Sequence, residues 1–280
     1  MKGAEPRIDL PLARGRRLRS DHTLVVGILN ATPDSFSDGG LLADPGALDT
    51  RIRAMLAEGA DLLDVGGEST RPGHAAVPAA EEMRRILPVL GSIRRIDADV
   101  PVSVDTRKAA VAQAALDAGA DLVNDVSALA DPAMADVVRA ARCGVVLMRN
   151  APCRGDVVAA CRRQLDEAVH HAVAAGIDGR AIVVDPGLGF GDPPGGDPGA
   201  NLALVDRLQD AAGPRPALVG ASRKRFVGRI TGIDEPTRRV HGSVAVAVLA
   251  ALRGAALVRV HDVAATVQAI RVVRGIPSVQ

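Results

Sequence analysis

Short apolar runs, each ending in a polar or charged residue, recur along the whole chain. The run 102–104 is rich in β-branched residues, which favour buried strands, and Asp105 follows it directly. Because an unpaired carboxylate is costly to bury in an apolar core, Asp105 is expected to point out of the carboxyl end of its strand into a cleft. Similar runs end at Asn30, Asp64, Asn124, Asp185, Ser222 and Arg259.

Helical segments alternate with these runs. Strands are expected at 24–29, 61–65, 102–105, 121–124, 144–148, 181–185, 216–220 and 255–260. Helices are expected at 45–58, 79–95, 108–118, 131–142, 156–175, 201–211, 236–252 and 262–273. Eight strand–helix units predict an α/β fold of the (β/α)8 TIM-barrel type. The alternative is an open doubly wound sheet, but the first unit lacks a dinucleotide-binding fingerprint.

The whole chain, residues 1–280, is expected to form one domain, since no change in composition divides it. A single barrel of this type needs about 250 residues, which suits the length. Residues 1–20 are interpreted as an N-terminal extension, in which 7–19 form a short hairpin or plug ahead of the first core strand.

Composition narrows the class of partner. A net charge of +1 leaves no electrostatic footprint for nucleic acid or an acidic membrane surface. No apolar run reaches transmembrane length, and the first 20 residues lack the apolar core of a signal peptide. Cys143, Cys153 and Cys161 have no metal-ligand spacing and suit free thiols in a reducing compartment. We therefore expect a cytoplasmic protein with no nucleic-acid or membrane partner.

The loops that follow the strands carry the candidate chemistry, because such loops build the active sites of barrels. The segment 185–191 (Asp-Pro-Gly-Leu-Gly-Phe-Gly) places a carboxylate beside bare backbone and one aromatic ring, and 222–224 (Ser-Arg-Lys) offers a cation. Arg259 and His261 precede a helix, an arrangement suited to phosphate, although His261 could equally cap that helix. No Ser-His-Asp or Cys-His nucleophile can be argued from order or spacing.

Several long segments resemble the signatures of dihydropteroate synthases, a family of folate-pathway enzymes. Residues 27–40 (Gly-Ile-Leu-Asn-Ala-Thr-Pro-Asp-Ser-Phe-Ser-Asp-Gly-Gly) are similar to the first signature, and residues 64–73 (Asp-Val-Gly-Gly-Glu-Ser-Thr-Arg-Pro-Gly) to the second. The similarity continues in the family's order through 103–106, 124–125, 185–191, 222–224 and 259–262.

The resemblance implies a pterin-binding TIM barrel with transferase activity. Such an enzyme condenses 6-hydroxymethyl-7,8-dihydropterin diphosphate with p-aminobenzoate and releases pyrophosphate, with Mg²⁺ present. The resemblance also implies a homodimer formed through outer helices and a target of sulfonamides.

Site roles follow from the same resemblance, residue by residue. Pterin binding is implied for Thr70, Asp105, Asn124, Met148, Asp185, Lys224 and Arg259. Diphosphate binding is implied for Asn30, Arg71, Arg259 and His261, with Asn30 also meeting Mg²⁺. The p-aminobenzoate pocket is implied for Ser69, Thr70, Arg71, Pro72, Phe190, Ser222 and Lys224. The catalytic residues are then Asp105, Asp185, Lys224 and Arg259.

Two positions depart from the family pattern. Where the family usually continues Met-His-Met or similar, this chain has Met148-Arg149-Asn150, which places an additional cation near the expected pterin pocket. Where the family has Lys after the Gly-Phe-Gly run, this chain has Asp192, followed by the insertion 193–198.

Two other functions stay open at this point. A methyltetrahydrofolate-methyltransferase-like barrel would share the ring-holding Asp and Asn residues, but it does not need the 69–72 or 222–224 segments. A catalytically silent pterin-binding paralogue is disfavoured by intact Asp105, Asp185, Lys224 and Arg259, whereas the departure at Arg149 keeps this alternative open.

Overall fold

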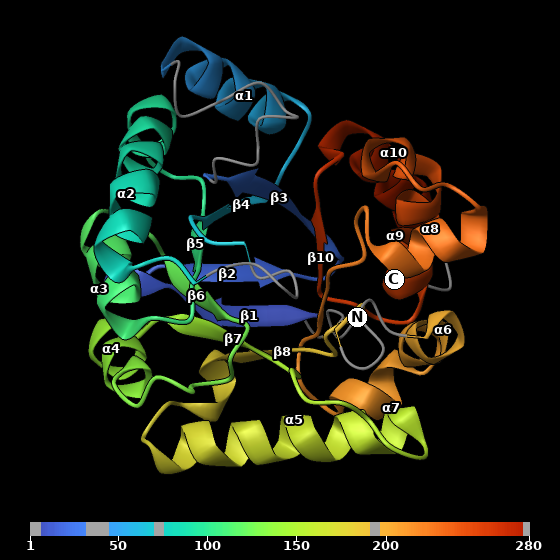
Figure 1. Cartoon of the computed structure of the whole chain (residues 1–280). Coiled ribbons are helices and arrows are strands. Elements are labelled where there is room, and N and C mark those ends of the chain that lie inside the picture. Colours follow the sequence, from blue (N-terminus) through green and yellow to red (C-terminus); the bar gives the residue numbers. More distant parts are fainter. Residues whose placement is uncertain (1–6, 32–44, 70–75, 191–196, 277–280) are drawn as a thin grey trace, which may run out of the picture.

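A closed barrel of eight parallel strands forms the centre of the protein in the computed structural model, which describes residues 7–31, 45–69, 76–190 and 197–276 (Figure 1). The strands are β3 (Leu24–Asn30), β4 (Leu62–Gly66), β5 (Val102–Asp105), β6 (Leu122–Asp125), β7 (Gly144–Met148), β8 (Ile182–Asp185), β9 (Leu218–Val219) and β10 (Leu257–Val260). They pair in the order β8-β7-β6-β5-β4-β3-β10-β9. A parallel bridge between Val184 and Ala217 joins the two ends of this sheet, which confirms the predicted barrel.

Helices surround the strands on the outside (Figure 1). They are α1 (Pro45–Ala57), α2 (Ala79–Ile96), α3 (Ala109–Asp117), α4 (Met134–Ala141), α5 (Val157–Ala174), α6 (Pro198–Asp206), α7 (Leu208–Ala212), α8 (Arg225–Thr231), α9 (Val240–Leu252) and α10 (Val263–Arg274). Side-chain caps fix two starts: Asp156 accepts from Val158 N at the start of α5, and Asp197 accepts from Ala200 N at the start of α6.

The helices differ from the sequence prediction in three places. The single helix expected at 201–211 is two helices, because Arg207 leaves the helical region with φ −107° and ψ 41°. The helix expected from residue 236 begins at Val240, after a 3-10 turn at Pro236–Arg238. Helix α8 was not predicted; it lies within the connection from β9 to α9.

An antiparallel hairpin, β1 (Ile8–Pro11) with β2 (Arg17–Ser20), closes the amino end of the barrel. Leu10 and its neighbours on the hairpin pack against the first inward-facing residues of the barrel strands in one apolar cluster: Ile8, Leu10, Leu12, Leu18, Leu24, Val26, Leu62, Leu122, Val146, Val183, Leu218, Ala256 and Leu257. The predicted N-terminal plug is therefore confirmed, and the plug leaves the opposite, carboxyl end for the site.

Buried Asp121 attaches the plug to the barrel. Its carboxylate accepts hydrogen bonds from Arg14 (2.8 Å), Arg16 (3.0 Å) and Arg94 (2.6 Å), and from the backbone N–H of Val102 (2.9 Å). Four donors satisfy this charge at the amino end of β6. Within the described ranges, no helix is long and apolar enough to cross a membrane.

Candidate active site

Strand register sets four predicted residues side by side at the carboxyl end of the barrel. Asp105 of β5 pairs with Asn124 of β6, and Met148 of β7 pairs with Asp185 of β8. All four are buried. Parallel strands bring their carboxyl ends to the same rim, so the apolar run and polar end seen in the sequence become neighbouring side chains at one mouth.

Arg259 links two carboxylates at this mouth. It donates from Nε to Asp64 Oδ2 (2.6 Å) and from Nη2 to Asp105 Oδ2 (2.8 Å). Burial acts against the charge of Arg259, but Asp64 and Asp105 outweigh it and raise the pKa of the guanidinium. Asp64 also accepts a hydrogen bond from Ser103 Oγ, so the cluster joins β4, β5 and β10.

Asp105 carries an unused acceptor. The residue is 7% exposed, and its Oδ1 is buried without a hydrogen-bond partner among the described residues. Burial raises the pKa of Asp105 to about 7; Arg259 opposes this shift and the charge of Asp64 adds to it. A buried acceptor left unpaired costs about 1–3 kcal/mol, so an N–H donor from a ligand would be stabilised there.

Asp185 and Lys224 form the second half of the cluster. Asp185 Oδ1 accepts from Gly187 N (2.7 Å), and burial raises the pKa of this carboxyl group against the opposing charge of Lys224. Burial lowers the pKa of Lys224 to about 8, while the charges of Asp185 and, less strongly, Asp105 raise it. The two carboxylates and the ammonium therefore act on one another across a single site.

Phe190 lies beside this cluster in the loop after β8. The Nζ of Lys224 stands 4.7 Å from the centre of its ring and donates to the carbonyl of Leu188. A cation over an aromatic face is attracted by about 0.5–2 kcal/mol, depending on exposure. Together, Phe190 and Lys224 offer a flat apolar surface and a positive charge on this side of the site.

Ser222 and His261 meet at the mouth as well. The Ser222 hydroxyl oxygen accepts from His261 N (3.1 Å) and lies 3.0 Å from His261 Nδ1. Between Ser222 and Lys224, Arg223 has a φ of 60° and binds Asp262 through two hydrogen bonds of 3.1 and 2.7 Å. This anchored turn orients the neighbouring side chains of Ser222 and Lys224 toward the site.

Two further predicted residues, Asn30 and Ser69, lie at or just after the ends of β3 and β4. Asn30 ends β3 and is half-buried, and Ser69 is half-buried after β4. Thr70, Arg71 and Pro72 lie outside the described residues, as does Asp192.

Asp64 and Ser103 belong to the site but were not assigned a role from the sequence. Their signal was present: Asp64 is a lone carboxylate inside the apolar run of β4, and Ser103 interrupts the run of β5. Both positions face the barrel interior, where only a paired polar group is tolerated. What the sequence could not give is the partner, Arg259, which is 195 residues from Asp64.

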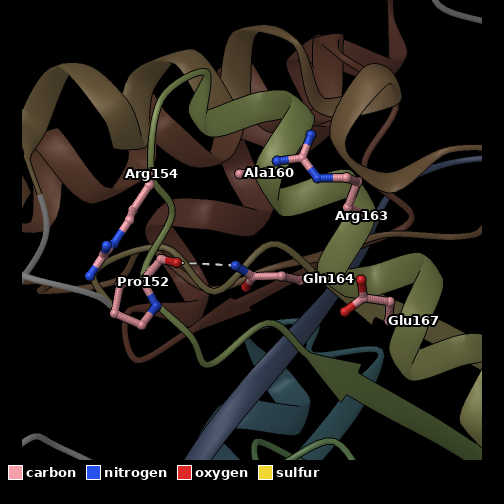
Figure 2. A pocket seen from close by; sticks show the side chains of 6 residues that line it. All are labelled: Pro152, Arg154, Ala160, Arg163, Gln164 and Glu167. Carbon is pink, nitrogen blue, oxygen red and sulfur yellow. Dashed lines mark hydrogen bonds between the residues drawn. The ribbon is translucent and has the colours of Figure 1, made fainter.

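The described residues contain no group of three or more His, Cys, Asp or Glu side chains that could hold a metal ion. A surface pocket does occur where α5 meets the loop after β7, lined by Pro152, Arg154, Ala160, Arg163, Gln164 and Glu167 (Figure 2). None of these residues belongs to the cluster at the barrel mouth.

Comparison with known proteins identifies the class of this barrel. The sequence pattern of the pterin-binding enzymes matches residues 26–261. The chain belongs to this family.

Its relatives within the family are dihydropteroate synthases. The chain is 46% identical over 266 residues to the dihydropteroate synthase of Mycobacterium leprae, covering 89% of this chain and 92% of that protein. It is 45% identical over 263 residues to a probable bifunctional folylpolyglutamate synthase/dihydropteroate synthase of Haloferax volcanii, covering 90% of this chain but only 30% of that longer protein. The structure of Xanthomonas albilineans dihydropteroate synthase with 4-aminobenzoic acid superposes with a TM-score of 0.87 at 47% identity, covering 96% of this chain and 100% of that chain.

Proposed function

We propose that this protein is a dihydropteroate synthase, a transferase of folate biosynthesis. It joins 6-hydroxymethyl-7,8-dihydropterin diphosphate to p-aminobenzoate and releases pyrophosphate. The observation that carries the proposal is the pair of buried strand-end carboxylates, Asp105 and Asp185, at one mouth with Lys224 and Arg259. The family membership and the 4-aminobenzoic acid bound to the Xanthomonas relative support it.

The pterin ring is the natural ligand for the carboxylate side of the site. The unpartnered Oδ1 of Asp105 accepts a ring N–H, with Asn124 and Asp185 offering further polar groups and Met148 an apolar surface. This role removes the cost of leaving a buried acceptor unpaired.

The same carboxylates stabilise the charge that develops in the reaction. The bond between the pterin methylene carbon and the diphosphate oxygen breaks, the electron pair leaves with pyrophosphate, and positive charge spreads from the methylene into the ring. A carboxylate about 4 Å from a unit positive charge contributes about 4 kcal/mol at an effective dielectric of about 20. Asp105 and Asp185 are already oriented, so little reorganisation opposes this effect.

Basic groups receive the leaving group. Arg259 is 20% exposed in its side chain, so its outer edge can face a diphosphate while its inner edge stays on Asp64. His261 stands at the start of α10, with its backbone N–H and ring directed to Ser222. Arg71 adds a further cation from the loop after β4 by the family resemblance.

Magnesium fits this chemistry through Asn30. Mg²⁺ usually keeps few protein ligands and takes the rest of its oxygen shell from substrate phosphates and water. The Asn30 amide oxygen at the end of β3 is a suitable hard donor, and a bound Mg²⁺ would neutralise charge on the departing diphosphate.

The p-aminobenzoate stands on the opposite side of the pterin methylene. Phe190 offers a flat surface to the aromatic ring, while Lys224 and Ser222 offer donors. Ser69, Thr70, Arg71 and Pro72 complete this pocket by the family resemblance. The arylamine nitrogen forms the new bond to the methylene carbon and loses one proton, so no side-chain nucleophile is needed.

Turnover by the purified protein tests the proposal. With both substrates and Mg²⁺, we expect stoichiometric 7,8-dihydropteroate and pyrophosphate, and inhibition by a sulfonamide that p-aminobenzoate relieves. A protein that binds the pterin diphosphate but forms no product would instead be a silent paralogue. Methyl transfer from methyltetrahydrofolate, without dihydropteroate formation, would establish the methyltransferase alternative.

The pH dependence of kcat/KM for the pterin diphosphate is expected to be bell-shaped, because this parameter reports groups of the free enzyme. Burial raises the pKa of Asp105 to about 7, and the anion is the useful form, so activity rises with pH through about 7. Burial lowers the pKa of Lys224 to about 8, and the cation is the useful form, so activity falls above about 8. A flat profile from about pH 6 to about pH 9 would contradict these roles.

We further propose a cytoplasmic homodimer. All three cysteines are free thiols, as expected in a reducing compartment. Helices α9 and α10 present exposed apolar side chains on the outer surface, including Leu252 and Val272, the latter 72% exposed. Sedimentation equilibrium is expected to give twice the chain mass of 28.8 kDa, and a single-chain mass would contradict the dimer.

A further inference from the structure

The guanidinium of Arg149 is buried between the loops that follow β7 and β8. The residue is 5% exposed and donates from Nε to Pro186 O (2.7 Å) and from Nη1 to Ala151 O (2.7 Å). Its Nη2 donates to Gly187 O (2.9 Å) and Phe190 O (3.2 Å). Four of the five N–H donors of the side chain are therefore used on backbone carbonyls. The additional cation noted in the sequence points at protein backbone.

The segment 186–190 is also held from its other side. Lys224 Nζ donates to Leu188 O, and Asn201 Oδ1 accepts from Gly189 N (2.6 Å). Gly187 has a φ of 65°, and a side chain there would collide with the carbonyl of Arg149. The carbonyls of four of these five residues thus accept from Arg149 or Lys224, and little space remains for a different backbone path.

We propose that Arg149 is a positioning residue for the p-aminobenzoate side of the site. It fixes the 186–190 backbone so that the Phe190 ring stays against Lys224, 4.7 Å from Nζ to the ring centre. A guanidinium suits this task because its donors are spread over three nitrogens in a rigid plane and reach carbonyls of both loops, whereas the three donors of an ammonium all lie on one nitrogen. The inference rests on the proposed function, since it concerns binding of the second substrate.

The pterin side depends on Arg149 much less. The backbone N–H of Arg149 donates to Asp185 O (2.9 Å), and any substitution other than proline keeps this bond. The β7–β8 ladder fixes the backbone of Asp185, while its Oδ1 accepts from Gly187 N (2.7 Å) in the turn directly after the strand. Removal of the guanidinium therefore releases the loop that carries Phe190 and leaves the strand end that carries Asp185.

A control residue lies in the same loop. Arg154 is exposed at the surface pocket beside α5, where Gln164 Nε2 donates to Pro152 O at 3.1 Å (Figure 2). Arg154→Met removes the same charge from the same connection without touching the 186–190 segment. It controls for the net charge of the loop.

Steady-state kinetics of Arg149→Met, Arg149→Lys and Arg154→Met test the proposal, with both substrates varied. Arg149→Met is expected to raise KM for p-aminobenzoate about tenfold or more while KM for the pterin diphosphate changes less than about threefold, because misplacement of a binding group by about 1 Å is enough for such losses. Arg149→Lys, which keeps the charge but loses the fork, is expected to fall between wild type and Arg149→Met. Arg154→Met is expected to match wild type.

The inference is overturned if folded variants of Arg149 keep the wild-type KM for p-aminobenzoate, or if both KM values rise by the same factor. Circular dichroism establishes folding, and Arg149→Lys carries the test if Arg149→Met does not fold. Wild-type protein without turnover would refute the proposed function itself. Wild-type turnover with an unchanged ratio of the two KM values would refute only the role of Arg149.

Discussion

Asp105→Asn is expected to lower kcat about a thousandfold, the loss typical of removing one preorganised electrostatic group, while the barrel stays folded. Asparagine keeps the shape and one acceptor for Arg259, but it removes the negative charge that faces the pterin cation. Because burial raises the pKa of Asp105, the charged form of this carboxylate lowers the stability of the folded state. The free energy of unfolding at neutral pH should therefore stay close to that of wild type.

Asp121→Asn is the matched control for this prediction. Asp121 is a buried, ion-paired aspartate at the opposite end of the barrel, bound to Arg14, Arg16 and Arg94. Its loss should reduce the free energy of unfolding by about 1–3 kcal/mol and leave kcat of the folded enzyme unchanged. In urea unfolding and kcat measurements, Asp105→Asn should therefore lose kcat and keep its free energy of unfolding. Asp121→Asn should keep kcat and lose free energy of unfolding. Wild-type turnover by Asp105→Asn would show that the site is misassigned.

Arg259→Met is expected to have the second large effect, on stability and on turnover together. The substitution leaves Asp64 and Asp105 buried without their cation, which costs about 3–5 kcal/mol in comparable buried pairs. It also removes the group proposed to receive the diphosphate, so kcat/KM for the pterin diphosphate should fall at least about a hundredfold.

The double variant Arg259→Met with Asp64→Asn separates the two effects. Removing one orphaned carboxylate should restore part of the lost free energy of unfolding, because the two sites are in direct contact and couple. Turnover should stay as low as in Arg259→Met. If Arg259→Met unfolds at the same urea concentration as wild type, the ion pairs of Arg259 with Asp64 and Asp105 do not stabilise the folded state.

The barrel was predictable from the sequence because its physical cause is local. Apolar runs such as 102–104 and 182–184 are buried strands, and each ends in a carboxylate that can only be accommodated at the rim. Parallel strands then bring Asp105 and Asp185 to the same mouth. The break at Arg207 was not predictable, because the apolar residues of α6 and α7 continue across it.

The pairings within the site were less accessible from the sequence. Arg259 contacts Asp64 and Asp105 across the barrel interior, because its strand β10 lies two strands from β4 and three from β5 in the strand order of the barrel. The direction of Arg149 was equally hidden: its position after β7 indicates a cation at the mouth, whereas its guanidinium turns to the carbonyls of the next loop. The partner that each of these side chains contacts depends on strand order and on loop backbone geometry, which the periodicity of the strands does not encode.

A crystal structure with 7,8-dihydropteroate tests the central assignment most directly. The pterin ring is expected between Asp105 and Asp185, with a ring N–H within hydrogen-bond distance of Asp105 Oδ1 and the benzoate half against Phe190. A ring bound elsewhere, or one that leaves Asp105 Oδ1 without a partner, would contradict the account.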